Sequence, residues 1–200
     1  MTVVKGSLES TREPVKFTYK DLLELDRAGI LGDKRVELID GEIIEMSPPK
    51  PGHAITVTEL SEALTLALGD RAKVSVRNPL RLSASMDDRH LPLPGIAVIK
   101  RRVYRDHPLP ADVYLLVEVA DASLSDDRGR KLELYAGHGI PEYWIINLLT
   151  QRIEVYTDPK GQEYLTRSTY TLTESIAPTR FPDTKRQWLP QALLEPGEAE

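Results

Sequence analysis

An almost uninterrupted apolar run, DVYLLVEVA at residues 112–120, restricts the folds open to this chain. Its aliphatic and aromatic side chains are typical of a β-strand. One carboxylate, Glu118, lies inside the run between Val117 and Val119. Because burying an unpaired carboxylate costs free energy, Glu118 must face water, a cation or a basic partner. A structural ion pair and a functional acid both satisfy this requirement.

Periodicity predicts helices before and after this strand. A short capping box, Thr18 with Asp21, opens a first helix that Gly29 ends. Apolar residues recur at helical spacing over residues 53–68, and Gly69 follows them. Two further helices are expected: one capped by Asp126 or Asp127 that runs to Gly137 or Gly139, and a short one near residues 188–194.

The clearest hairpin signal is RVELIDGEIIEM at residues 35–46, because Asp40-Gly41 suits a tight two-residue turn. Alternation of strands and helices predicts an α/β (α+β) fold, a mixed central β-sheet flanked by helices. We expect a flexible arm over residues 1–16, a single domain over 17–194 and an acidic tail over 195–200. The other strand-like segments are residues 73–76, 96–100, 139–146, 152–157 and 164–170.

Composition excludes several classes of site. The chain of 200 residues has no cysteine, so disulfides, thiolate zinc sites and cysteine nucleophiles are ruled out. No apolar run approaches the roughly 18 residues that a membrane helix needs. The N-terminal residues also lack the apolar segment of a secretory signal. We expect a cytoplasmic protein without a membrane partner.

The net charge of −5 hides an uneven distribution along the chain. Residues 71–105 hold nine basic residues against two acids, Asp87 and Asp88, which gives +7 for this segment and −12 for the rest. Gathered on one face, such a segment can neutralise a phosphate backbone; the alternative is a set of solvated side chains that never converge. The nine are Arg71, Lys73, Arg77, Arg81, Arg89, Lys100, Arg101, Arg102 and Arg105.

Three more side chains are candidates for chemistry. Lys131 follows Glu118 by 13 positions, and a strand that folds back into a helix can bring the two together. Glu37 precedes the hairpin turn and can point inward, although hairpin charges usually solvate an edge. His53 follows a Pro/Gly loop, where it can contact a phosphate or simply cap a helix. A solvated helix lysine is the ordinary alternative for Lys131.

Several segments together resemble a known family. RVELIDGEIIEMSPPKPGH, PGIAVIK and DVYLLVEVADASLSDDRGRKLELYAGHGIPEYWIIN are similar to the Uma-type family of restriction endonuclease-like proteins, a domain of unknown function in the PD-(D/E)XK nuclease superfamily. The resemblance runs from about Phe17 to Tyr170, and residues 112–147 are its most specific part. It implies a restriction endonuclease-like fold.

The resemblance also implies roles for individual residues. Glu118 matches an acid that holds a divalent metal, and Lys131 matches a lysine that positions the attacking water. Glu37 matches a hairpin acid, a further metal or water ligand, and His53 matches a recurring histidine of uncertain role. The expected ion is Mg²⁺, with Mn²⁺ as a substitute, because hard oxygen ligands suit it. The expected partners are DNA, contacted by Arg77, Arg81, Lys100, Arg101 and Arg102, and a second copy of the chain in a homodimer.

The chain departs from the family pattern at one position. Pro94-Gly95 stands where the superfamily has Pro-Asp, so the first metal-binding acid is missing. Either a nearby aspartate (Asp87, Asp88 or Asp112) substitutes, or the remaining acids hold a weakened metal, or the site is inactive. Three functions follow: a metal-dependent DNA endonuclease impaired at Gly95, a nuclease fold that binds nucleic acid or protein without cutting, and an interaction protein with no nucleic-acid role.

Overall fold

The predicted mixed sheet is present, with β5 and β6 as the pair of strands at its centre. In the computed structural model, which describes residues 14–189, the strand order is β3-β4-β5-β6-β7-β8. The pair β5 and β6 runs parallel, and the other neighbouring strands run antiparallel. The strands are β3 (Lys73–Val76), β4 (Ile96–Ile99), β5 (Val113–Ala120), β6 (Glu142–Asn147), β7 (Arg152–Lys160) and β8 (Glu163–Thr171).

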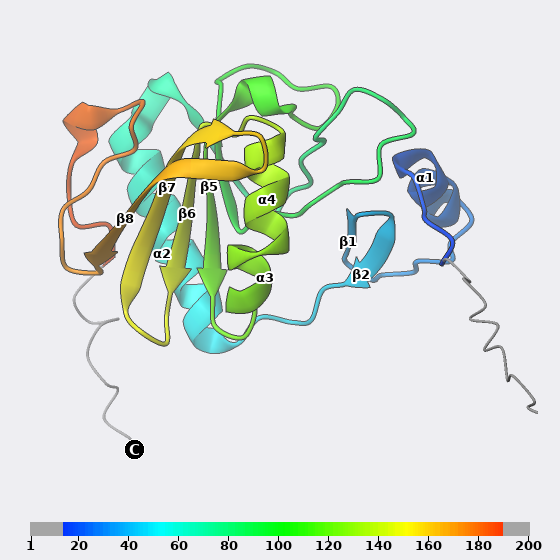
Figure 1. Cartoon of the computed structure of the whole chain (residues 1–200), viewed down its shortest axis with the longest axis horizontal. Helices are drawn as coiled ribbons and strands as arrows, with labels where there is room; N and C mark the ends of the chain where they lie inside the picture. The colour runs from blue at the N-terminus through cyan, green and yellow to red at the C-terminus, as the bar shows by residue number, and fades with distance from the viewer. Residues whose placement is uncertain (1–13, 190–200) are drawn as a thin grey trace, which may run out of the picture.

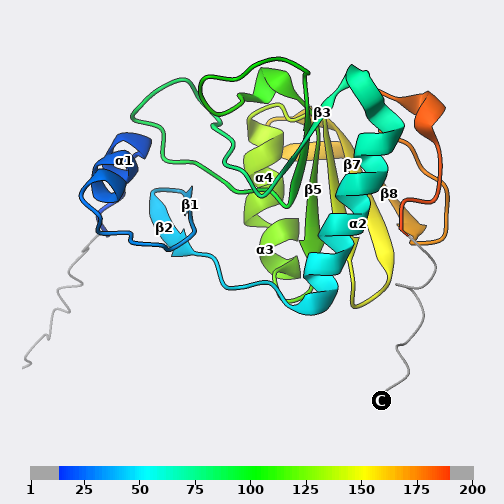
Figure 2. The ribbon, with the colours of Figure 1, turned by 180° about the vertical axis from the view of Figure 1, so that it is seen from behind.

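Helices cover both faces of this sheet (Figures 1 and 2). Because side chains alternate along a strand, β5 serves two cores at once. Val117 belongs to the same buried cluster as Leu64 of the long helix. Leu116 belongs to the cluster of the opposite face, with Tyr135, so Glu118 points to that second face. The helices are α2 (Pro51–Leu68) on the first face, and α3 (Leu124–Arg128) and α4 (Arg130–Gly137) on the second.

A small lobe of α1 (Tyr19–Arg27) and a hairpin, β1 (Val36–Ile39) with β2 (Glu42–Glu45), lies beside the sheet (Figure 1). The predicted turn is confirmed: Asp40 and Gly41 have φ of 50° and 73°, the left-handed values that a tight hairpin needs. Leu38 pairs with Leu91 of the long loop between β3 and β4. The hairpin is thereby held against the loop that leads into β4.

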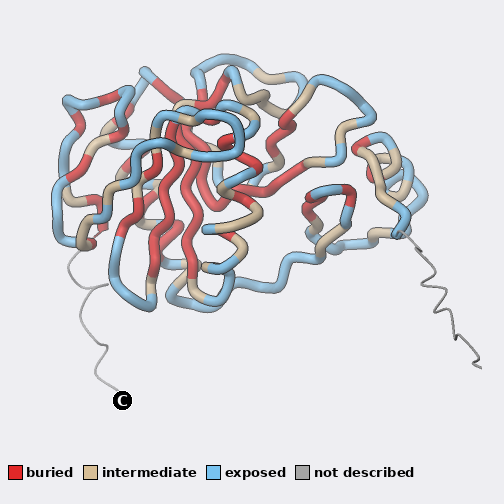
Figure 3. Tube along the Cα trace, in the orientation of Figure 1, coloured by how far each residue is buried: buried red, intermediate tan, exposed pale blue. Residues whose placement is uncertain are grey.

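Most predicted elements are confirmed, with shifted ends. The capping box is present: the Asp21 N–H donates to Thr18 Oγ1 and the Thr18 N–H to Asp21 Oδ2. The second helix begins two residues earlier than predicted, at Pro51, because proline suits the first helical position. Burial follows the sheet: β5 and β6 are buried over almost their whole length (Figure 3).

Two helix predictions were wrong in part. Asp126 and Asp127 do not cap the third helix; it begins at Leu124, after Ser123, and a break at Gly129 separates α3 from α4. Asp127 is instead buried. In the predicted C-terminal helix, residues 188 and 189 are not helical, and 190–194 lie outside the described residues.

The predicted arm and tail fall almost wholly outside the described residues, so the domain boundaries stay a prediction. Within residues 14–189, no helix is long and apolar enough to cross a membrane.

Candidate functional site

Glu118 lies near the end of β5 and is buried, with 7 % of its surface exposed. Both of its carboxylate oxygens accept hydrogen bonds. Oε1 accepts from Lys131 Nζ and from the Tyr135 hydroxyl, each at 3.1 Å, and Oε2 accepts from the Gly95 N–H at 3.0 Å. The ion pair with Lys131 therefore offsets the free-energy cost of burying the Glu118 carboxylate inside an apolar strand.

Lys131 reaches Glu118 because the chain folds back after β5, as its spacing predicted. It lies at the start of α4 and is only 4 % exposed, so the solvated alternative is wrong. Its ammonium is 3.6 Å from Glu37 Oε2 and 3.8 Å from Asp127 Oδ1, in addition to Glu118. One buried ammonium is therefore shared by three carboxylates, which we name the acid cluster: Glu37, Glu118 and Asp127.

Glu37 comes to this cluster from the hairpin, and it points inward as one of its two alternatives predicted. It is 3 % exposed, and its Oε2 accepts a hydrogen bond from the Leu93 N–H at 3.3 Å. Alternation along β1 turns its side chain toward α4, away from solvent. The predicted residues Glu37, Glu118 and Lys131 thus lie together, although they come from three separate elements.

The interpretation of the sequence missed Asp127 and Tyr135. Asp127 is four positions before Lys131 and its Oδ2 accepts from Ser123 Oγ at 2.6 Å. Tyr135 is four positions after Lys131, so the two side chains share one face of α4. This i, i+4 spacing on either side of Lys131 was the available signal. It was hidden because Asp127 also fits an N-cap and Tyr135 also fits a core position.

Crowding of charge shifts the pKa values of the cluster. Burial alone would lower the pKa of Lys131, but Glu118, Glu37 and Asp127 outweigh it and raise that pKa. Burial raises the pKa of Glu37, against the opposing effect of Lys131. Burial and then the Glu118 charge raise the pKa of Asp127 to about 7. Lys131 is thus a permanent ammonium at neutral pH, and three carboxylates share this single positive charge.

Gly95 lies directly against Glu118. A Cβ added at Gly95 would lie 3.5 Å from Glu118 Oε2 and 3.1 Å from the Val117 carbonyl oxygen. A side chain at position 95 would therefore be directed at the Glu118 carboxylate. Glycine has no side chain to offer there, and Gly95 contacts the Glu118 carboxylate through the hydrogen bond from its backbone N–H.

Comparison with known families decides the assignment. Residues 19–189 match the Uma2 family, which is described as "Putative restriction endonuclease". The chain belongs to the Uma2 family. A similar solved structure is that of "a putative nuclease belonging to DUF820 from Anabaena variabilis ATCC 29413", at a TM-score of 0.66 and 16% identity over 86% of this chain and 94% of that one. At this identity the likeness shows the fold alone, and no curated protein matches the chain.

The basic residues of this Uma2 protein do not gather at the acid cluster. Of the five predicted to contact DNA, Arg77 alone is adjacent: its N–H donates to the Gly95 carbonyl oxygen at 3.1 Å. Strand β4 runs antiparallel to β5, with Ile99 opposite Val113. The residues at 100–102 therefore lie at the end of the sheet away from Glu118. The +7 segment is spread over both ends of the sheet.

Three of those arginines already have structural partners. Arg81 is 8 % exposed and pairs with Asp106 at 2.7 Å. Arg101 donates to the carbonyl oxygens of Ala72 and Gly69, just after α2 ends. Arg102 pairs with a buried aspartate, Asp112, at 2.6 Å, and Lys100 is exposed. DNA contact by these four residues stays a prediction.

His53 lies in the first turn of α2, and its Nδ1 is 2.9 Å from Nη2 of Arg77. A guanidinium has only donors, so Nδ1 accepts and the ring is neutral with its proton on Nε2. Burial, and then the Arg77 charge, lower the pKa of His53 accordingly. The N-cap of α2 is Lys50, so His53 does not cap the helix, and its contact with a phosphate stays a prediction.

A metal ion is expected from the family resemblance, but the acid cluster offers an incomplete set of ligands for one. Within residues 14–189, no three histidine, aspartate or glutamate side chains converge closely enough to hold a metal ion. The three carboxylates surround the Lys131 ammonium instead, and Gly95 adds no side-chain oxygen. The two carboxylates predicted to bind metal, Glu37 and Glu118, are therefore one ligand short.

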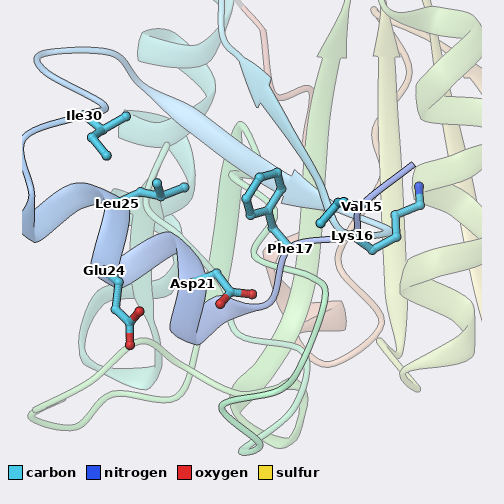
Figure 4. Close-up of a pocket in the computed structure, with 7 residues that line it drawn as sticks. All are labelled: Val15, Lys16, Phe17, Asp21, Glu24, Leu25 and Ile30. Atoms are coloured by element: carbon cyan, nitrogen blue, oxygen red, sulfur yellow. The ribbon is translucent and has the colours of Figure 1, made fainter. Parts of the chain in front are cut away.

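A cavity lies beside the small lobe, away from the acid cluster. It has a volume of about 400 Å³ and lies beside α1, where Val15, Phe17, Leu25 and Ile30 are among its lining residues (Figure 4). None of the predicted site residues lines it.

Proposed function

We propose that this chain is a metal-dependent DNA endonuclease of the restriction type, weakened by the missing acid at Gly95. Membership of the Uma2 family supports the reaction class. The observation that carries the proposal is the direction of position 95: a Cβ there would lie 3.5 Å from Glu118 Oε2. The chain keeps an acid–lysine arrangement suited to phosphodiester hydrolysis and lacks only the side chain that would face Glu118.

Glu118 and Glu37 would hold Mg²⁺ or Mn²⁺, because hard divalent cations prefer carboxylate oxygens. Such an ion supplies Lewis acidity toward the phosphodiester. The electrostatics of the cluster suit a cation, since burial and the surplus of negative charge raise the pKa values of Glu37 and Asp127. The ligand set is one carboxylate short, so we expect weak affinity for the ion.

Lys131 has a defined part in this proposal. As a permanent ammonium it has only donors, so it cannot remove a proton from water. It can orient an attacking water and stabilise negative charge that develops on the phosphoryl group. Tyr135 and the Gly95 N–H hold the Glu118 carboxylate in one orientation through the bonds at 3.1 and 3.0 Å.

A plasmid-nicking assay with Mg²⁺ or Mn²⁺ tests the proposal. The wild type should convert supercoiled plasmid slowly to the nicked form, and Glu118→Ala should abolish this. Gly95→Asp should increase nicking, because it adds a carboxylate facing Glu118. The backbone of Gly95 is outside the left-handed region, so aspartate needs only a shift of a few tenths of an ångström from the Val117 carbonyl.

Glu133→Ala is the matched control, since Glu133 is an exposed acid on the same helix as Lys131. It should nick like the wild type. Nicking by Glu118→Ala at the wild-type rate would mean that the activity comes from a contaminant, and the proposal would fail.

A second candidate is a nuclease fold that binds nucleic acid without cutting it. The filled centre of the acid cluster favours it, since Lys131 already bonds Glu118 at 3.1 Å and Gly95 supplies no side-chain ligand. In this case calorimetry should show no Mn²⁺ binding by the wild type and measurable binding by Gly95→Asp. Tight Mn²⁺ binding by the wild type would exclude this candidate.

A further inference from the structure

Two arginines next to the acid cluster lack a carboxylate partner. Arg35 Nη2 donates to the Arg77 carbonyl oxygen at 2.7 Å, and Arg77 Nη2 donates to His53 Nδ1 at 2.9 Å. Across the described part of the chain, neither arginine forms an ion pair with an acid. Neighbouring arginines differ: Arg130 pairs with Asp40 at 2.8 Å, and Arg128 pairs with Glu154.

The positive charges of Arg35 and Arg77 repel each other unless an anion lies between them. Burial, and then the charge of Arg35, lower the pKa of Arg77, so the two guanidinium groups do sense each other. His53 adds no charge, because its Nδ1 accepts from Arg77 and its proton is on Nε2. The three side chains therefore offer donors and a net positive charge. Glu118 and Asp121 act on His53 through their charges, but no acid of the described residues forms an ion pair with Arg35 or Arg77.

The backbone also holds Arg77 in an unusual conformation. Its φ is 49°, in the left-handed region that is strained for a residue other than glycine. The Arg77 N–H donates to the Gly95 carbonyl oxygen at 3.1 Å, and the Gly95 N–H donates to Glu118 at 3.0 Å. Gly95 therefore links Arg77 to Glu118 of the acid cluster through two backbone hydrogen bonds.

We infer that Arg35, Arg77 and His53 form a phosphate-binding site, the phosphate cradle, which holds a backbone phosphate of DNA beside the acid cluster. The inference deepens the proposed function, on which it rests for the identity of the ligand. Guanidinium groups donate two parallel hydrogen bonds to phosphate oxygens, and the neutral imidazole adds an Nε2–H donor. A hairpin, a helix and a strand edge each contribute one side chain, so the cradle forms only in the folded chain.

Fluorescence anisotropy with a labelled DNA duplex, in EDTA and at several salt concentrations, tests the cradle without cleavage. Arg77→Gln and Arg35→Gln should each weaken binding about tenfold. Each should also reduce the slope of log affinity against log salt by about 0.9, the value for one lost phosphate contact. Arg105→Gln is the matched control, because Arg105 is exposed and belongs to the same basic segment. It should leave both quantities unchanged.

A second arm separates DNA from free phosphate as the source of the ligand. Calorimetry with inorganic phosphate is compared with chloride at equal ionic strength, on the wild type and Arg77→Gln. Binding of DNA that depends on Arg77 and Arg35 but not Arg105 supports the cradle. If Arg77→Gln, Arg35→Gln and Arg105→Gln weaken DNA binding equally, or if none of them weakens it, the phosphate cradle is overturned and the proposed function still stands.

The remaining outcomes are also decisive. Phosphate binding that depends on Arg77, with no DNA binding by the wild type, keeps the cradle and overturns the proposed function. No binding of either ligand overturns both. Circular dichroism on each variant confirms folding, and Arg35→Gln, on a different element from Arg77, guards against a local defect at the strained residue.

Discussion

Replacing Lys131 by methionine tests whether one ammonium allows three carboxylates to share a buried space. The ammonium lies 3.1, 3.6 and 3.8 Å from oxygens of Glu118, Glu37 and Asp127. At an effective dielectric constant of about 20, each distance corresponds to roughly 5 kcal/mol of gross attraction. Methionine keeps most of the apolar stem and removes the charge, so packing changes little.

The net loss is smaller than this gross attraction, because the folded variant can bind a proton in place of the ammonium. Protonating a glutamate of ordinary pKa 4.5 costs about 1.4 kcal/mol for each pH unit above that value. The cost is about 4.8 kcal/mol at pH 8 and about 0.7 kcal/mol at pH 5. A carboxyl whose folded pKa is raised loses stability as pH rises, so Lys131→Met should be far less stable at pH 8 than at pH 5.

Urea unfolding in EDTA, followed by the fluorescence of the buried Trp144 and Trp188, measures this difference. We expect a loss of roughly 5 kcal/mol in the free energy of unfolding at pH 8 and about 1 kcal/mol at pH 5. Lys73→Met, at an exposed lysine of β3, should change either value by less than about 0.5 kcal/mol. Equal losses at the two pH values would refute the charge argument, because a packing defect does not depend on pH.

Three further predictions concern single groups. Folding raises the pKa of Asp127 from 3.8 to about 7, so ionisation of this carboxyl destabilises the folded wild type. The loss in the free energy of unfolding begins near pH 4 and approaches about 4 kcal/mol above pH 7. Asp127→Asn should therefore show a smaller decline of the urea midpoint with pH. Tyr135→Phe removes a donor from Glu118 and should cost about 1.5–3 kcal/mol at pH 8 by urea unfolding, with an unchanged circular dichroism spectrum. Thr18→Ala removes the acceptor for the Asp21 N–H and should cost about 1 kcal/mol in the same assay.

Those site residues could be predicted from the sequence whose positions depend on the local residue pattern and on the direction in which the chain turns. Glu118 was identified because a carboxylate inside an apolar strand needs a partner. Lys131 was identified because a strand followed by a short loop and a helix folds back. The hairpin turn at Asp40-Gly41 followed from the left-handed backbone that these residue types tolerate. In each case the signal lies within about a dozen residues.

What the sequence could not predict depends on contacts between distant segments. The charge of residues 71–105 suggested one basic face, but β4 runs antiparallel to β5 and carries residues 100–102 to the far end of the sheet. Arg35 was not singled out, because its contact with Arg77 spans 42 positions. Asp127 fitted a cap equally well by pattern, and only the break at Gly129 turns it inward.

The hairpin links the two halves of the candidate site. Glu37 lies in β1 and Arg35 directly precedes that strand, so the hairpin segment carries both side chains. Glu37 reaches the Lys131 ammonium at 3.6 Å, whereas Arg35 reaches the Arg77 carbonyl oxygen at 2.7 Å. On the two proposals, the acid missing at Gly95 belongs to the half that contains Glu118, and the phosphate cradle does not include it. The proposals therefore predict that DNA binding and DNA cleavage are separable, with binding less affected than cleavage by glycine at position 95.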